Sequence, residues 1–351
     1  MFAGNQAQKF LAAFRASQKI PDAWDAWRSY RAQVTENIIE NSIPGTSLAI
    51  FGAGRLNDLS LPKFLGHFSR VALFDIDEAA MREALLRDAG KFLCGEKISC
   101  EKTGMSAALN MFPVDFVGIA DGDYIAFADA MLQIVESLYF YAFAAAEKKT
   151  GKPPWPDRDA DAILSRMYQK AQDELSGMYE KSRAHIPELP QETYDYTVAL
   201  GVHSQLGNVP AWLLDAIEAY LRKKEGFWRG DNHGICGGFW EQGWQDMKEK
   251  LLVCMEREST FLSERLNEII LSATKRKAFI GCEVSRAVCE DGIWYAVPES
   301  HVSGAWQAAE DVKRRAARGS ISFENYLDII WPFSLAEGKA YRMMVMEIQV
   351  G

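Results

Sequence analysis

Residues 47–58 read SLAIFGAGRLND, and residues 71–77 read VALFDID. The apolar start of the first segment predicts a short buried strand, and Gly52 and Gly54 after it permit a tight turn in which a ligand can approach the backbone closely. The second segment predicts another strand, which ends at Asp75, 21 residues after Gly54. A carboxylate at this spacing can accept hydrogen bonds from the hydroxyl groups of a ribose. Together the two segments predict an adenosine-binding α/β unit.

The glycine pattern separates two kinds of adenosine ligand. A dinucleotide fold has a third glycine where the helix packs beside the pyrophosphate, but Asn57 stands at that position here. A ligand with adenosine and no pyrophosphate needs the first turn and the ribose acid, and it does not need a bare helix N-terminus. S-adenosylmethionine is such a ligand. We also expect Asn57 or Asp58 to cap a helix over residues 59–68.

Residues 47–90 resemble the first half of a class I S-adenosylmethionine-dependent methyltransferase, with FGAGR at 51–55 as the glycine motif and LFDIDE at 73–78 as the acidic loop. Residues 194–206 resemble the fourth strand of that fold and the loop over the methyl group, and residues 331–350 resemble its closing hairpin. The resemblance implies an α/β fold with a Rossmann-like seven-stranded sheet, one antiparallel strand and helices on both faces. It also implies S-adenosyl-L-methionine as cofactor. An Asn-Pro-Pro-Tyr signature is absent, so the resemblance does not name the acceptor.

Helical periodicity surrounds this core in the sequence. It predicts an N-terminal helical cap over residues 1–43 and a helical insertion over residues 124–191. The methyltransferase-like α/β core would then comprise residues 44–123 and 192–351. The insertion could cover the site or make a subunit contact.

The third strand has two candidate segments, residues 98–103 and residues 112–119. In the resembled fold, a polar residue after this strand hydrogen-bonds the adenine amine, and Asp115 or Asp121 would serve, with Asp115 favoured. The complete set of cofactor-binding residues that we predict is Phe51, Gly52, Ala53, Gly54, Asn57, Asp75, Ile76, Asp115 and Gly201.

A predicted strand over residues 197–202 brings residues 203–205 to the carboxyl edge of the sheet, where ligands bind in open α/β folds. His203 at this edge is a candidate general base, because its ordinary pKa suits neutral pH. The alternative is a histidine that hydrogen-bonds a neighbouring carbonyl. Residues 227–244, rich in glycine and aromatics, predict a loop on the acceptor side. The candidate substrate residues are Ser204, Gln205, Trp228, His233 and Trp240, with Glu283 and His301 beside later strands as further candidates.

Composition excludes several classes of protein. The net charge of −9 argues against a general nucleic-acid binder, because Lys and Arg clusters carry affinity for phosphate backbones. The 6 cysteines form no C-x-x-C pair, which argues against a zinc or iron–sulfur site. The N-terminus lacks a signal-peptide pattern and no apolar stretch is long enough to span a membrane, so we expect a cytoplasmic protein with reduced thiols. As partner we expect a small-molecule substrate, without nucleic acid or membrane, and a homo-oligomer stays open.

The favoured hypothesis is a methyltransferase that moves a methyl group from S-adenosylmethionine to a small-molecule acceptor by in-line displacement, mainly by holding donor and acceptor in line. An NAD(P)-dependent oxidoreductase is the alternative enzyme class, because Asp75 suits the ribose of NAD equally well. A third hypothesis is a methyltransferase-like scaffold that binds a partner through its helical insertion without catalysis.

Overall fold

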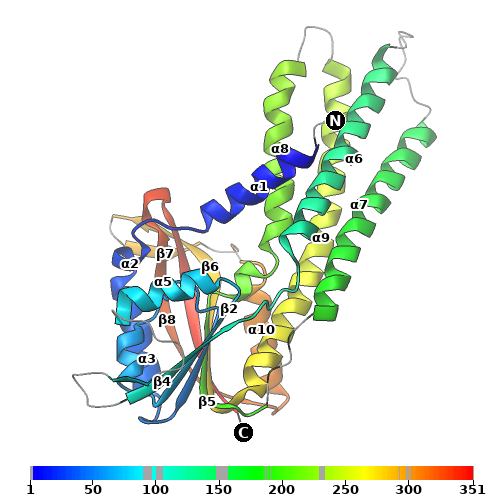
Figure 1. Cartoon of the computed structure of the whole chain (residues 1–351). Coiled ribbons are helices and arrows are strands. Elements are labelled where there is room, and N and C mark those ends of the chain that lie inside the picture. Colours follow the sequence, from blue (N-terminus) through cyan, green and yellow to red (C-terminus); the bar gives the residue numbers. More distant parts are fainter. Residues whose placement is uncertain are drawn as a thin grey trace. The chain divides into compact units, whose positions relative to one another are not determined.

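The computed structural model describes residues 3–89, 97–99, 106–147, 157–185, 187, 189, 191–228, 234–291, 293–297, 300 and 302–350. These residues form two compact units (Figure 1). The helical unit comprises residues 1–19, 118–185 and 207–258, and the α/β unit comprises residues 20–117, 186–206 and 259–351.

The α/β unit contains one sheet whose strand order is β3-β4-β2-β1-β5-β6-β9-β8, with β7 paired to β6. Strands β4, β2, β1, β5 and β6 are parallel neighbours, and β9 lies antiparallel between β6 and β8. This is the predicted seven-stranded Rossmann-like sheet with one antiparallel strand, which is confirmed, and β3 and β7 are short additions. The strands are β1 (Ser47–Phe51), β2 (Arg70–Asp75), β3 (Lys97–Ser99), β4 (Ser106–Pro113), β5 (Tyr194–Leu200), β6 (Thr274–Glu290), β7 (Ile293–Ala296), β8 (Ser322–Ser334) and β9 (Lys339–Gln349).

The third strand of the parallel series is β4, which coincides with neither predicted segment. It pairs with β2 from Ala108 to Pro113, while β3 runs antiparallel along its outer edge. Residues 106–111 read SAALNM and lack the β-branched and aromatic residues that favour strands in sequence analysis. Pairing with the buried strand β2 therefore overrides their weak intrinsic preference.

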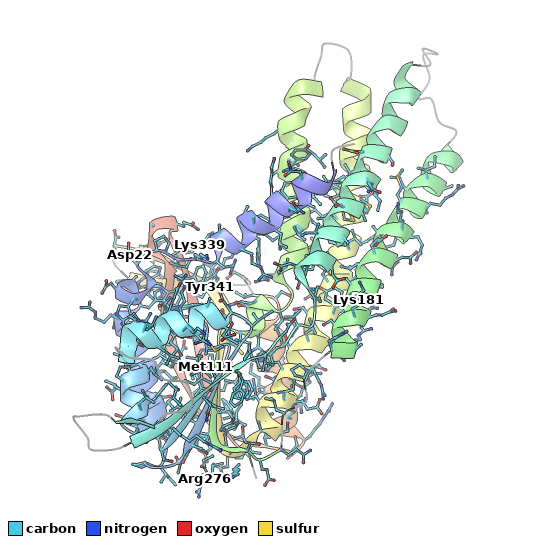
Figure 2. The ribbon with its side chains drawn as sticks, viewed as in Figure 1. Asp22, Met111, Lys181, Arg276, Lys339 and Tyr341 are labelled. Atoms are coloured by element: carbon cyan, nitrogen blue, oxygen red, sulfur yellow. The ribbon has the colours of Figure 1, made fainter. Side chains whose placement is uncertain are left out.

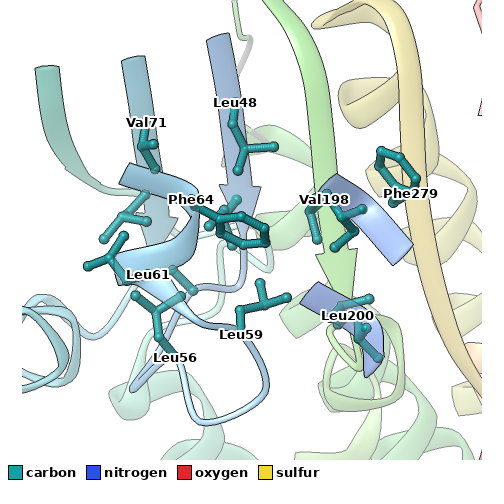
Figure 3. Packing of buried hydrophobic residues seen from close by; sticks show 14 of the residues in the cluster. Leu48, Leu56, Leu59, Leu61, Phe64, Val71, Val198, Leu200 and Phe279 are labelled. Atoms are coloured by element: carbon teal, nitrogen blue, oxygen red, sulfur yellow. The ribbon is translucent and has the colours of Figure 1, made fainter. Parts of the chain in front are cut away.

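Helices cover both faces of this sheet (Figure 1). One face packs against α2 (Ala23–Ala26), α3 (Arg28–Glu40), α4 (Leu61–Leu65) and α5 (Glu78–Ala89). The other face packs against α10 (Ala305–Ala317), and the final turns of α9 (Gly234–Ser272) contact α10, where Asn267 donates to the carbonyl of Ala308 at 3.0 Å. Figure 3 shows the first of these interfaces, where alternate residues of the strands meet the apolar sides of the helices and the turn before α4; among the labelled residues are Leu48, Val71, Val198, Phe64 and Leu59.

The strands differ in length, and this difference shapes the ligand-binding edge. Strand β1 has 5 residues and β5 has 7, whereas β6 has 17, β8 has 13 and β9 has 11. Strands β6, β8 and β9 therefore continue past the carboxyl ends of β1 and β5. Figure 2 labels Arg276, near the start of β6, and Tyr341, which pairs with Arg286 at the far end of this extension.

The helical unit contains α1 (Ala3–Ser17), α6 (Asp121–Glu147), α7 (Asp157–His185), α8 (Asn208–Trp228) and the first two thirds of α9. Ring contacts join α1 to α8, since Phe14 and Trp212 have centroids 5.5 Å apart. Lys248 of α9 forms ion pairs with Asp215 and Glu218 of α8, which join these two helices. This unit differs from the predicted boundaries, because α1 and residues 207–258 group with the insertion helices while α2 and α3 pack on the sheet. Of the described helices, none combines the length and the apolar character that a membrane span needs.

The predicted loop over residues 227–244 is wrong for most of its length. Helix α8 continues to Trp228 and α9 begins at Gly234, and residues 229–233 lie outside the described residues. One of its glycines has a packing role, because a Cβ on Gly243 would come within 2.8 Å of the Leu164 side chain of α7. Close packing of two helices thus explains a glycine that is typical of loops in isolation.

Candidate functional site

The carboxyl edge of the parallel sheet gathers most of the predicted site residues in the order of the strands. Asp115 follows β4, Asp75 ends β2, the glycine turn follows β1, Gly201 follows β5, and Glu283 lies in β6 beside the end of β5. Ligands of open α/β sheets bind at this edge, because loops and side chains from several strands converge there. The sheet topology therefore assembles one continuous site from five separate segments.

The glycine turn after β1 has the backbone conformation that its sequence predicts. Gly52 and Gly54 have φ values of +68° and +46°, in the region that favours glycine. The N–H groups of Gly52 and Ala53 donate to the carbonyl of Phe74, at 2.8 and 3.1 Å, which ties the turn to β2. A Cβ on Gly52 would lie 1.7 Å from Cγ2 of Val202, so this position has no room for a side chain.

Asp75 is held beside this turn by two backbone groups. Its Oδ2 accepts the N–H of Gly54 at 2.8 Å, and its Oδ1 accepts the N–H of Asp77 at 2.8 Å. Burial raises the pKa of this carboxyl, and the two N–H donors oppose the rise. Each carboxylate oxygen keeps further acceptor capacity for a ribose hydroxyl. Next to Asp75, the apolar Ile76 is 58% exposed, as expected for a residue that lies against a flat ligand.

Asp115 lies beside Asp75 on the neighbouring strand. The N–H of Val114 donates to the carbonyl of Asp75 at 2.9 Å, so the chain after β4 continues along the end of β2. The carboxylate of Asp115 accepts the N–H of Val117 at 2.8 Å, which fixes its orientation.

Asn57 and Asp58 do not cap the first helix, contrary to the prediction. Helix α4 begins only at Leu61, after Ser60, and has no side-chain cap. Asn57 is instead held from outside the turn, since Arg31 donates to its carbonyl at 2.8 Å and Arg87 donates to its Oδ1 at 3.0 Å. The hydrogen bonds of Asn57 with these two arginines therefore hold the end of the glycine turn in place.

The two arginines that hold Asn57 also enclose Trp24. The guanidinium carbons of Arg31 and Arg87 each lie 3.5 Å from the centroid of the Trp24 ring. Two guanidinium groups cannot share one face of a ring at that distance, so they lie on opposite faces. This three-layer contact joins the N-terminal helices and α5 to the glycine turn.

Phe51 and Ala53 have buried side chains. The ring of Phe51 stacks on Phe74, with centroids 5.1 Å apart, and Phe74 stacks on Phe112 at 4.9 Å. Phe51 and Ala53 are 1% and 2% exposed. Any contact of these two residues with a ligand would have to come from the backbone.

His203 lies in a fully buried position on the side of α9 and α10. Its exposure is 0%, and burial lowers its pKa to about 4, against the smaller opposing effects of Asn267 and Asp311. A general base must reach the proton that it removes. The burial of His203 speaks against the catalytic role that we predicted. The alternative that we gave, a hydrogen bond to a neighbouring carbonyl, is not found either, because neither ring nitrogen bonds a carbonyl of the described residues.

Ser204, one residue later, faces the site. Its hydroxyl donates to Oε1 of Glu283 at 2.8 Å. Gly201, with φ of +63°, leaves room for this contact, because a Cβ there would lie 3.2 Å from the same oxygen. Gln205 is exposed, and its amide donates to the carbonyl of Gly201 at 3.3 Å.

Sequence analysis named Glu283 and Ser204 as candidates but missed Asp58, Tyr30 and Trp331 beside them. Burial raises the pKa of Glu283 to about 7, and the charge of Asp58 contributes to the rise. Burial also raises the pKa of Asp58 to about 7, and there the charge of Asp75 contributes. Tyr30 of α3 and Trp331 of β8 complete this group, with stacked rings whose centroids are 6.0 Å apart. The one available signal was an acid within the apolar segment AFIGCEV, residues 278–284.

The structure gives no side-chain contacts for the remaining candidates. The side chains of Trp228 and Trp240, and the whole of His233 and His301, lie outside the described residues.

Comparison with known proteins returned matches among solved structures alone. No protein-family model matches the chain, and no curated protein matches it. A magnesium protoporphyrin IX methyltransferase from Synechocystis PCC 6803, with bound S-adenosylmethionine, is 9% identical over 95% of this chain and 86% of its own, with a TM-score of 0.37. An S-adenosylmethionine-dependent methyltransferase from Methanosarcina mazei is 8% identical over 89% and 96%, with a TM-score of 0.39. An N-methyltransferase from Bradyrhizobium japonicum WM9, with bound S-adenosylhomocysteine, is 8% identical over 93% and 87%, with a TM-score of 0.35.

These matches extend over nearly the whole chain. The sheet has seven main strands with β9 antiparallel between β6 and β8, in line with the sheet with one antiparallel strand that the sequence resemblance implied. The chain therefore has the fold of the class I S-adenosylmethionine-dependent methyltransferases.

Proposed function

We propose that this protein is a methyltransferase that uses S-adenosyl-L-methionine to methylate a small-molecule acceptor. The observation that carries the proposal is Asp75, held at the end of β2 by the N–H of Gly54 from the glycine turn. This contact holds a carboxylate and a turn without side chains next to each other, at the edge where α/β sheets bind ligands. Asp115 lies on the adenine side and Gly201 on the opposite side.

When bound, S-adenosylmethionine supplies a methyl group on a positively charged sulfur. The residues of this chain would hold the donor and exclude water. Asp75 would bind the ribose hydroxyls, Asp115 the adenine amine, and Ile76 the face of the ring. The Gly52–Gly54 backbone would lie along the ribose and the methionine part. Much of the rate enhancement would come from holding donor and acceptor in line.

The start of α4 favours this donor over NAD. A pyrophosphate binds best at a helix N-terminus that directly follows the glycine turn. Here the helix begins at Leu61, has 5 residues, and is separated from the turn by the braced Asn57. The segment after the glycines therefore lacks the feature that binds a pyrophosphate.

The test is calorimetric binding of S-adenosylhomocysteine, with NAD as the competing ligand and Asp75→Ala as the test variant. Hydrogen bonds to a charged group contribute about 1.5–3 kcal/mol, so the variant should bind on the order of 10- to 100-fold more weakly. Asp77→Ala is the matched control. It removes a neighbouring carboxylate whose Oδ1 accepts the N–H of Ala80 at 2.9 Å, outside the ribose position.

Each outcome separates the hypotheses. Binding of S-adenosylhomocysteine that Asp75→Ala weakens and Asp77→Ala leaves intact would support the proposal. Binding of NAD alone would contradict it in favour of an oxidoreductase. Absence of binding of either ligand to the folded protein would favour the scaffold that binds a partner without catalysis.

A further inference from the structure

Glu283 is an acid in an apolar row of the sheet. It pairs with Met343 of β9, which pairs with Ile329 of β8. Met343 and Ile329 belong to the hydrophobic core that α3 covers, and Glu283 alternates with Phe279 and Gly281 onto the same face. Glu283 is 3% exposed. A carboxylate in such a place costs free energy unless a partner compensates for its charge.

Only one of the two carboxylate oxygens of Glu283 has a hydrogen-bond partner among the described residues. Oε1 accepts the hydroxyl of Ser204 at 2.8 Å, but Oε2 is buried and has no hydrogen-bond partner among the described residues. The charged group that acts most strongly on it is another acid, Asp58, which raises the pKa of Glu283. The arrangement provides a neutral hydroxyl and a like charge, and no described cation balances it.

Aromatic rings form the other side of this position. Trp331 packs edge-on against Trp27, with centroids 4.9 Å apart, and stacks with Tyr30 at 6.0 Å. The ring of Trp331 would lie 3.4 Å from a Cβ on Gly201, next to the carboxylate. A buried carboxylate oxygen without a partner accepts hydrogen bonds from an ammonium group, and the aromatic rings beside it offer apolar contacts to the carbon substituents of that group. A neutral ligand would leave the charge uncompensated, and an anion would be repelled.

We propose that Glu283, with Ser204, Tyr30 and Trp331 around it, binds a positively charged amine of the acceptor, so that the acceptor class is a small amine. This inference rests on the proposed function, which supplies the assignment of donor and acceptor sides. Oε2 of Glu283 accepts an N–H of the ammonium group, and the aromatic rings cover its carbon substituents.

The strand order assigns this amine to the acceptor. S-adenosylmethionine has an ammonium group of its own, which could compete for the same carboxylate. Asp75, however, ends β2, whereas Glu283 lies in β6, and β1 and β5 lie between these two strands in the sheet. Glu283 is therefore separated from the ribose acid by two strands.

The experiment measures the binding of phenethylamine, 2-phenylethanol and 3-phenylpropionate by calorimetry to the full chain saturated with S-adenosylhomocysteine. The three probes share a skeleton and differ in charge. We expect phenethylamine to bind at least about tenfold more tightly than the other two, and Glu283→Gln to remove that preference, because the variant keeps the shape and loses the charge. Glu347→Gln is the matched control, since Glu347 is an equally buried acid on β9 that pairs with Lys277 at 3.4 Å.

Separate readouts distinguish the possible failures. Binding of S-adenosylhomocysteine to wild type and Glu283→Gln tests the proposed function and the integrity of the fold. If that binding is intact and the amine shows no preference, or keeps it in Glu283→Gln, the amine site is wrong. If phenethylamine binds only without S-adenosylhomocysteine, the carboxylate serves the donor, which also overturns the inference.

Discussion

The proposed donor side and the proposed acceptor side of this site are built in opposite ways. The donor side comes from residues 51–77, a nearly continuous segment in which Gly54 and Asp75 are joined by a direct hydrogen bond. The acceptor side comes from Tyr30, Ser204, Glu283 and Trp331, which are distant in sequence and meet because β6 and β8 extend past the parallel strands. The comparison teaches that a short motif can specify the cofactor, whereas the substrate depends on how the whole sheet closes.

The largest effect, a loss of folding stability, should come from a substitution at Gly52 in the glycine turn. Gly52→Ala places a Cβ within 1.7 Å of Val202 in a left-handed conformation, so we expect the free energy of unfolding to fall by about 3 kcal/mol or more. Urea unfolding measures this loss. Gly45→Ala is the control, because Gly45 has a φ of +78° with no atom within 4 Å, and it should lose only about 1 kcal/mol. Equal losses in the two variants would show that Val202 moves aside.

A smaller effect, a pH-dependent gain in folding stability, should come from a substitution at Glu283. Its pKa is raised by burial from 4.5 to about 7, so the folded protein binds a proton that the unfolded chain releases in this range. The buried charge therefore destabilises the fold above pH 7, and this penalty disappears as the pH falls towards 4.5. Glu283→Gln should be more stable than wild type by on the order of 2 kcal/mol near pH 8, with a difference that shrinks towards pH 5.

Urea unfolding at a series of pH values checks this second prediction. A difference between wild type and Glu283→Gln that stays constant with pH would mean that the carboxyl is not buried in the way described. The same series on Glu347→Gln provides the control.

A third effect, a loss of about 1 kcal/mol in the free energy of binding S-adenosylhomocysteine, should follow from replacing Trp24, whose contacts support the glycine turn. Trp24→Leu deletes the ring that Arg31 and Arg87 enclose, so Asn57 loses part of its support. We expect several-fold weaker binding of S-adenosylhomocysteine and unchanged binding of phenethylamine, while Trp24→Phe, which keeps an aromatic face, should stay close to wild type. Equal weakening of both ligands would show that the two sides are not independent.

The smallest effect should come from Ser204→Ala. Its hydroxyl lowers the pKa of Glu283 by hydrogen bonding to Oε1, so its removal should raise that pKa slightly. Binding of phenethylamine weakens as the pH falls through the pKa of Glu283, because the carboxylate becomes neutral while the amine stays charged. The midpoint of this dependence should move up by less than about one pH unit. A downward movement would contradict the contact.

Sequence reasoning predicted the parallel sheet well and the helical regions less well. The strands at 48–51 and 71–75, the long helices and the closing hairpin follow from local apolar patterns, and the structure confirms them. The third strand and the helix over residues 234–244 were mispredicted, because partners distant in sequence decide both. His203 illustrates the same limit, since its position after β5 is readable, but its burial beside α9 and α10 is not.

The sequence by itself determined the glycine turn and the acid beside it, because a turn that requires glycine and an acid at a fixed distance from it depend only on local geometry. Tertiary structure alone decided that Asn57 supports the turn, that His203 is buried, and that Glu283 lies beside aromatic rings with one buried oxygen that has no partner among the described residues. The physical reason is that burial and electrostatic environment are set by neighbours distant in sequence, and packing chooses those neighbours only when the sheet has closed.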